Sequence, residues 1–264
     1  MTADERTLLR ATFEQVPELY DRARPGYPRR LFDDLVALAR LSAGARLLEI
    51  GCGTGQATVP LAERGFEIVC VEIGAGLAAL ARRNLARFPR VHVVNATFES
   101  WHAEGTFDTV VAFTAFHWID PDVRYAKPAS LLRPSGSLAV VATQHVLPED
   151  GDPFFAEVQD DYDAVVPSDD NRPPPPPDDV PDLSAEIEAS GYFAEPVVRR
   201  YLWDVEYSAA AYVDLLETFS GHRGVWDEDT RRRLYERIRR RIDTRPNATV
   251  RRTSIAILHV AKRL

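Results

Sequence analysis

Short apolar segments alternate with helical segments between residues 45 and 142, and this alternation limits the fold more than any other feature of the sequence. The segments with the character of buried strands are 45–50, 67–71, 91–94, 107–113 and 137–142. The segments with helical character are 29–40, 56–64, 75–87 and 123–132. Strands separated by helices of about ten residues are typical of crossover units, which make the strands parallel and cover both faces of the sheet. The sequence therefore predicts a doubly wound α/β domain.

The alternation stops after Thr143. Five consecutive prolines, Pro173 to Pro177, hold an extended left-handed helix that cannot enter a sheet or the interior of a helix. We interpret residues 148–181 as a stiff surface connector, with a hinge beside a lid as the alternative. Beyond it the pattern predicts helices over 182–189, 209–218 and 228–242 and strands over 197–207 and 251–260.

Three glycines directly follow the first buried strand. Gly51, Gly53 and Gly55 lie between this strand and the next helix, where residues without side chains let the backbone turn sharply and approach a ligand. The next strand ends at Glu72, 21 residues after Gly51. A carboxylate at this place can accept hydrogen bonds from both hydroxyls of a ribose. The sequence therefore predicts a nucleoside site at the carboxyl edge of the sheet.

Two related glycine-rich patterns fit this loop less well. A dinucleotide site needs a glycine at the sixth position of the loop, where this chain has Gln56. A phosphate-binding loop of the G-x-x-x-x-G-K type needs a lysine, and none follows here. The loop is therefore unfavourable for a closely packed pyrophosphate.

The charge balance argues against nucleic-acid and membrane partners. The chain has 40 acidic and 32 basic residues and a net charge of −8, which disfavours a general attraction to phosphate backbones or anionic lipids. Arginines gather in the runs 231–233 and 239–241. Because Leu234, Ile238 and Ile242 repeat every four residues there, we expect an amphipathic helix whose arginines form its solvated face.

The sequence carries few residues for metal or disulfide chemistry. Two cysteines, Cys52 and Cys70, are too few for a disulfide scaffold or a zinc ribbon, and the six histidines show no metal-ligand spacing. The first residues lack the apolar run of a signal peptide, and no stretch approaches the ~18 apolar residues of a membrane span. We therefore expect a soluble cytoplasmic protein with reduced thiols and no metal.

Six short segments share a further property. They are Tyr20–Pro28, Glu49–Gly55, Val71–Gly74, Phe98–Trp101, Ala115–Trp118 and Leu132–Gly136. Together they resemble the corresponding segments of class I S-adenosylmethionine-dependent methyltransferases, over roughly residues 12–143. The C-terminal third, including Ser220–His222, is similar to a largely uncharacterised bacterial subgroup of that family. The resemblance implies a Rossmann-like methyltransferase fold with seven mostly parallel strands, the C-terminal one antiparallel, an N-terminal helical cover and an insertion after strand five.

The resemblance also implies a single methyltransferase domain over residues 1–264. We divide this domain into an N-terminal cover (1–40), a cofactor-binding core (41–147), an insertion with substrate-side elements (148–225) and a C-terminal helix with an edge strand (226–264).

S-adenosyl-L-methionine is the cofactor that the resemblance implies. Glu72, with Ile73 beside it, would take the ribose hydroxyls. The loop with Gly51, Gly53 and Gly55 would pass under the ribose and the amino acid.

The other parts of the cofactor have candidates as well. Glu49 ends an otherwise buried strand, where a carboxylate is costly without a partner, and the cofactor ammonium would supply one directly or through water. Arg24, with Tyr20 beside it, is the candidate for the cofactor carboxylate. Family members often carry an acidic residue that accepts from the adenine amino group, whereas this chain has Thr97. Phe98 could pack on the adenine or in the core.

The methyl acceptor should lie beyond the fourth strand. His117 and Trp118 follow that strand at the carboxyl edge, where ligands bind in open parallel sheets. His117 is the catalytic candidate, either deprotonating the acceptor or orienting it, and Trp118 would form a wall. The other candidates for the acceptor pocket are Tyr27, His145, Trp203, Tyr207 and His222, each with a core or surface position as its alternative.

We therefore predict methyl transfer from S-adenosyl-L-methionine to an oxygen, nitrogen or carbon of a small molecule by in-line displacement. A base is needed only for acceptors such as alcohols and phenols, which must lose a proton. One alternative is a protein that binds S-adenosylmethionine and catalyses another reaction or none. A second alternative is an oxidoreductase that binds NAD. The sequence leaves the oligomeric state open.

Overall fold

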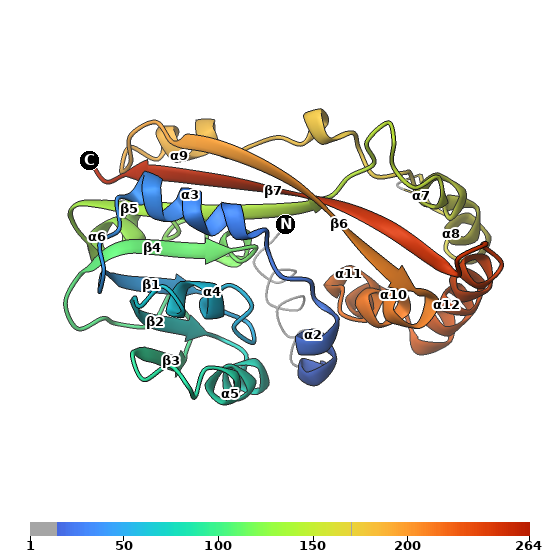
Figure 1. Cartoon of the computed structure of the whole chain (residues 1–264), viewed down its shortest axis with the longest axis horizontal. Helices are drawn as coiled ribbons and strands as arrows, with labels where there is room; N and C mark the ends of the chain where they lie inside the picture. The colour runs from blue at the N-terminus through green and yellow to red at the C-terminus, as the bar shows by residue number, and fades with distance from the viewer. Residues whose placement is uncertain (1–14, 170) are drawn as a thin grey trace.

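One sheet runs through the whole molecule (Figure 1). The structure, a computed structural model, describes residues 15–169 and 171–264. The strands are β1 (Arg46–Ile50), β2 (Glu67–Glu72), β3 (Val91–Asn95), β4 (Phe107–Phe113), β5 (Leu132–His145), β6 (Val197–Ser208) and β7 (Thr249–Lys262). Their order is β3-β2-β1-β4-β5-β7-β6, and β7 is antiparallel to both of its neighbours. The predicted mostly parallel seven-stranded sheet with an antiparallel C-terminal strand is confirmed.

The order of the strands reverses at β1. The chain passes from β1 outward to β2 and β3, then returns to place β4 on the other side of β1. The loops after β1 and β4 therefore leave the sheet in opposite directions and open a crevice at its carboxyl edge, the usual ligand position in open α/β sheets.

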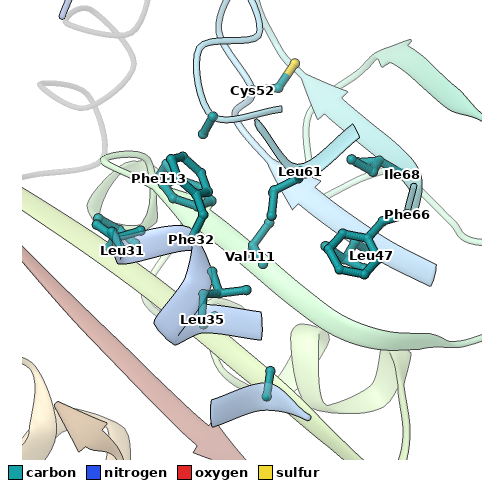
Figure 2. Close-up of a cluster of buried hydrophobic side chains, with 14 of the residues drawn as sticks. Leu31, Phe32, Leu35, Leu47, Cys52, Leu61, Phe66, Ile68, Val111 and Phe113 are labelled. Carbon is teal, nitrogen blue, oxygen red and sulfur yellow. The ribbon is translucent and has the colours of Figure 1, made fainter. Parts of the chain in front are cut away.

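Consecutive residues of β1 belong to different cores. Leu47 packs in one buried cluster and Leu48 in another on the opposite face of the sheet, as the alternation of side chains along a strand requires. Figure 2 shows the first cluster, where Phe32 of α3 (Arg29–Ala39) stacks on Phe113 with ring centroids 5.6 Å apart. Burial on both faces explains why the parallel strands are continuous apolar runs.

Helices cover both of these faces. The first face carries α3, α4 (Thr58–Ala62) and α5 (Ala75–Asn84), and the second carries α6 (Ala126–Leu131) and α9 (Ser184–Ala189). Before α3, the helix α2 (Pro17–Ala23) contacts α5. The strand β5 begins earlier than predicted because Leu132 pairs with Phe107 across an irregularity in the ladder.

Five helices gather at the far ends of β6 and β7 (Figure 1). They are α7 (Phe154–Glu157), α8 (Gln159–Val165), α10 (Ala209–Leu216), α11 (Ser220–Val225) and α12 (Glu228–Asp243). The prediction of a connector over 148–181 is wrong for α7 and α8. These helices are too short to show a periodic pattern, and they are stabilised by burying Phe154, Phe155 and Val158 in a third core.

The arginine-rich helix is α12, and the buried face predicted for it is confirmed at Leu234, Ile238 and Ile242. Its arginines are not all solvated, however. Arg237 and Arg241 bind the buried carboxylate of Asp161 on α8 at 3.1 and 2.5 Å. Through these ion pairs and its contacts with β7, α12 connects α8 to the sheet.

The proline run lies along the end of β5. The backbone N–H of Leu147 donates to the carbonyl of Pro175 at 3.0 Å. Pro177 begins the short 3-10 helix η3 (Pro177–Asp179), and Pro176 before it is extended, with φ −55° and ψ 151°. Within residues 15–169 and 171–264, no helix combines the length and the apolar character that crossing a membrane requires. The division into cover, core, insertion and C-terminal segment remains a prediction.

Candidate functional site

A cavity of about 360 Å³ lies at the carboxyl ends of β1, β2 and β4. Most of the residues predicted to hold the cofactor line it. They are Tyr20, Arg24, Gly51, Gly53, Glu72, Ile73 and Phe98. His117 and Trp118, predicted for the acceptor side, line the same cavity.

The glycine loop approaches the cavity with its backbone. Gly51 has φ +69°, and a Cβ atom there would lie 2.6 Å from the Cβ of Ala115 after β4. Gly53 has φ +58°, and a Cβ there would touch the ring of Tyr20. Both positions have a left-handed backbone, and at Gly51 a Cβ would also clash, so the loop requires glycine for geometry as well as for ligand access. Gly55 is outside the cavity lining and faces Leu85 at the end of α5.

Glu72, the last residue of β2, lines the cavity next to the glycine loop. Its Oε2 accepts a hydrogen bond from the backbone N–H of Gly53 at 2.8 Å, and its Oε1 accepts from the N–H of Gly74 at 2.9 Å. The residue is only 4% exposed and lines the cavity. Two amides thus fix the direction of the carboxylate before any ligand arrives.

Glu49 lies behind the loop and does not line the cavity. Thr58 donates its hydroxyl to Oε2 of Glu49 at 2.7 Å, whereas Oε1 is buried and, in the described part of the chain, has no hydrogen-bond partner. Burial raises the pKa of Glu49 to about 7, with the charge of Glu72 adding to the effect. A buried carboxylate with one free oxygen can bind an ammonium group directly or through a water.

Arg24 and Tyr20 form one wall. The Cζ of Arg24 lies 5.1 Å from the centroid of the Tyr20 ring, and its Nη2 donates to the carbonyl of Thr218 at 2.8 Å. The Nε of Arg24 is buried and finds no acceptor among the described residues. The guanidinium therefore retains donor capacity for an anionic ligand.

The opposite wall is apolar. Phe98 lines the cavity with Ile73 and is 5% exposed, so it belongs to both the cavity wall and the second core. Thr97 lies outside the lining, and its hydroxyl is 2.6 Å from that of Ser100. The geometry does not bring Thr97 to the site. Glu99, two residues further on, lines the cavity instead. It belongs to the segment Phe98–Trp101, but the resemblance carried by that segment implied no role for it.

His117 and Trp118 form the 3-10 helix η2 (Phe116–Trp118) directly after β4, with ring centroids 4.7 Å apart. His117 is exposed at the rim of the cavity. Desolvation of its ring against the wall, with a smaller effect of the Arg124 charge, lowers the pKa of His117 to about 4. The imidazole is therefore neutral at pH 7.

A second cavity, of about 240 Å³, adjoins the first. Tyr27, His145 and Trp203, all predicted for the acceptor pocket, line it. Thr114 and Thr143 line both cavities, with their hydroxyls 3.0 Å apart.

The boundary between the two cavities is strained and polar. Thr114 has φ +53°, a left-handed conformation that is rare for a β-branched residue and that clusters at functional sites. The hydroxyl of Tyr27 lies 3.0 Å from that of Thr114. Sequence reasoning missed Thr114 and Thr143 because neither belongs to a recognisable motif; their position after parallel strands was the available signal.

Two of the residues predicted for the acceptor pocket lie outside both cavities. His222 packs among aromatic rings, with its Nδ1 3.0 Å from the hydroxyl of Tyr235 and its ring centroid 4.6 Å from that of Trp226. Tyr207 is buried in the same third core. Their core positions, the stated alternative, are what the structure shows.

The described segments contain no group of three or more histidine, cysteine, aspartate or glutamate residues that could hold a metal ion.

Comparison with known proteins agrees with this geometry. The family model of the methyltransferase domain matches residues 47–136, which span the glycine loop, Glu72 and His117. An uncharacterised methyltransferase of Mycobacterium bovis is 32% identical over 142 residues, which are 53% of this chain and 55% of that protein. A trans-aconitate 2-methyltransferase of Deinococcus radiodurans is 30% identical over 108 residues, 40% of this chain and 41% of that protein. The chain thus spans about half the length of these curated relatives.

A solved structure shows the same fold over nearly the whole chain. A candidate type II methyltransferase of Anaeromyxobacter dehalogenans superimposes with a TM-score of 0.61 at 24% identity, covering 90% of this chain and 97% of that one. The fold is that of class I S-adenosylmethionine-dependent methyltransferases, and residues 47–136 match their methyltransferase domain.

Proposed function

We propose that this protein transfers the methyl group of S-adenosyl-L-methionine to a small-molecule acceptor. The observation that carries the proposal is the fixed carboxylate of Glu72, which lines the first cavity beside a glycine loop that brings its backbone close to a ligand. A matched methyltransferase domain supports the same function.

The residues of the first cavity suit each part of the cofactor. We assign the ribose hydroxyls to Glu72, because a carboxylate accepts from two hydroxyls at once. Arg24, beside Tyr20, holds the cofactor carboxylate. Glu49, which lies behind the glycine loop and does not line the cavity, holds the ammonium through a water. The adenine lies against Phe98 and Ile73. Bound there, the cofactor supplies the methyl group of its sulfonium, and the thioether that remains is a good leaving group.

The remaining work of the chain is to align the acceptor and exclude water. Trp118 and the aromatic residues of the second cavity form the walls around the acceptor. A histidine with a pKa of about 4 is a weak base at neutral pH, so His117 orients the acceptor through a hydrogen bond, which the neutral imidazole accepts from an amine N–H or donates to a carboxylate oxygen. Acceptors that need no deprotonation, such as carboxylates and amines, fit this arrangement better than alcohols.

Incubation with methyl-labelled cofactor and a metabolite extract tests the proposal. We expect S-adenosylhomocysteine to form in proportion to a labelled small molecule. Calorimetry should show binding of S-adenosylhomocysteine and none of NAD. Cofactor binding without any labelled product would favour a binding protein, and NAD binding would favour an oxidoreductase.

A further inference from the structure

Positive and basic groups gather around the second cavity. Arg24, Arg252 and His145 line it, from the segment after α2, from β7 and from β5 respectively. The Cζ atoms of Arg24 and Arg252 lie 4.8 and 6.0 Å from the centroid of one ring, that of Phe219. Two guanidinium groups thus share one aromatic neighbour.

No carboxylate of residues 15–169 or 171–264 forms a salt bridge with Arg24 or Arg252. The Nη1 of Arg252 donates to the hydroxyl of Ser254 at 2.6 Å, and its Nε is buried without an acceptor in the same ranges. The other half-buried arginines in this part of the molecule are paired: Arg245 binds Asp152 at 2.6 Å and Arg241 binds Asp161 at 2.5 Å. Arg252, like Arg24, is half-buried and lacks such a carboxylate partner among the described residues.

An unpaired cation in a partly buried position is unfavourable for the folded chain. Desolvation lowers the pKa of Arg252, and the charge of Arg24 acts in the same direction. Replacing such a group by an apolar one commonly stabilises a protein. The unfavourable free energy of this unpaired charge is offset when an anion enters the cavity and accepts hydrogen bonds from the free N–H groups.

The register of the sheet places Arg252 away from the first cavity. Thr143, at the boundary of the two cavities, pairs with Ala256, whereas His145 pairs with Ser254. Arg252 lies four residues from Ala256 along β7, about 13 Å at the rise of an extended strand. Burial lowers the pKa of His145 to about 2, so its ring is neutral and adds no second charge beside the anion site.

We propose that the second cavity binds the methyl acceptor and that this acceptor carries a carboxylate held by Arg252. The atom that receives the methyl group lies beside Thr114 and Thr143, and the carboxylate lies at the other end of the cavity. The guanidinium fork suits a planar carboxylate through two parallel hydrogen bonds. This inference rests on the proposed function, which assigns the first cavity to the cofactor and so leaves the second for the acceptor.

Thermal unfolding of the full chain tests the proposal without knowledge of the natural acceptor. Acetate, malonate, succinate, glutarate and benzoate are each compared with the corresponding neutral amide, at constant ionic strength, with and without saturating S-adenosylhomocysteine. We expect at least one acid to raise the Tm by about 3 °C or more while its amide does not. The variant R252M should lose this response, R252K should keep part of it, and R239M, an exposed control on α12, should keep all of it.

A second readout separates anion binding from a structural role. Without any ligand, R252M should unfold at a higher temperature than the parent chain, because it removes an unpaired charge. The proposal is overturned if no acid differs from its amide, if R252M retains the response, or if R252M is destabilised or fails to fold. Failure of the proposed function has a different signature: S-adenosylhomocysteine itself would not raise the Tm.

Discussion

The backbone N–H of Gly53 donates to Oε2 of Glu72 at 2.8 Å, so the end of β2 holds the glycine loop that follows β1. Glu72 is the last residue of β2 and Gly53 lies in the loop after β1, so the parallel pairing of β1 with β2 brings them together. One carboxylate therefore both fixes the loop and faces the cavity that the loop forms.

Replacing Glu72 by alanine should weaken cofactor binding by about 2 kcal/mol or more, because charge-assisted hydrogen bonds are lost. Calorimetric titration with S-adenosylhomocysteine measures the change. E67Q is the matched control, since Glu67 begins the same strand and pairs with Arg46 far from the cavity. Equal affinity of folded E72A and the parent chain would remove Glu72 from the site.

The pKa of Glu49 should make the unliganded protein less stable at alkaline pH. Its folded pKa of about 7 lies above the ordinary value of 4.5, so the folded state binds the proton more tightly than the unfolded state. Stability is then lost as the pH rises from about 4.5 to about 7, by about 3 kcal/mol in all. E49Q should therefore unfold at higher denaturant concentration than the parent chain at pH 8, with the difference vanishing near pH 4.5. The exposed E149Q is the control; a constant difference at all pH values would contradict this assignment.

Gly51 and Gly65 separate two effects of adding a methyl group. Both have positive φ, +69° and +82°, but only the Cβ at Gly51 meets an atom, Ala115 Cβ at 2.6 Å, while none lies within 4 Å at Gly65. G65A should cost about 1–2 kcal/mol of stability from the backbone alone. G51A should cost about 1–3 kcal/mol more and lower the affinity for S-adenosylhomocysteine. Urea unfolding of both variants checks the order, and equal losses would show that the loop can move away from Ala115.

H117A should lower kcat about tenfold while the Kd for S-adenosylhomocysteine stays within about twofold, since the side chain is assigned to acceptor orientation. The pH profile distinguishes orientation from proton abstraction. With a pKa of about 4 the ring is already neutral above pH 6, so kcat should show no limb from His117 between pH 6 and 8 and should fall only as the pH approaches 4. A limb near pH 7 that disappears in H117A would make His117 a general base.

Local sequence was sufficient for the strands and for the helices between the parallel strands, but not for α7 and α8. Parallel strands buried on both faces must be continuous apolar runs, and the three loop glycines must allow a left-handed backbone, so β1, β2 and the loop could be recognised without a structure. Glu72 was found for the same reason, because the residue that ends β2 must lie at the carboxyl edge.

The sequence did not predict which side chains come together through long-range strand pairing. The faces of β5, β6 and β7 are set by their register, which brings His145 opposite Ser254 and Trp203 opposite the same residue. His222 and Tyr207 fell outside the cavities because α10 and α12 bury them in a separate core, whose existence depends on the unpredicted α7 and α8.

The sequence by itself determined the sheet, the glycine loop and the acidic end of β2, because these depend on strand periodicity and on the backbone freedom of glycine. Only the tertiary structure decided which arginines remain without a carboxylate and which residues join the two cavities. Those properties depend on the distances between side chains more than 100 positions apart in the chain, such as Thr143 and Arg252, which no local pattern encodes.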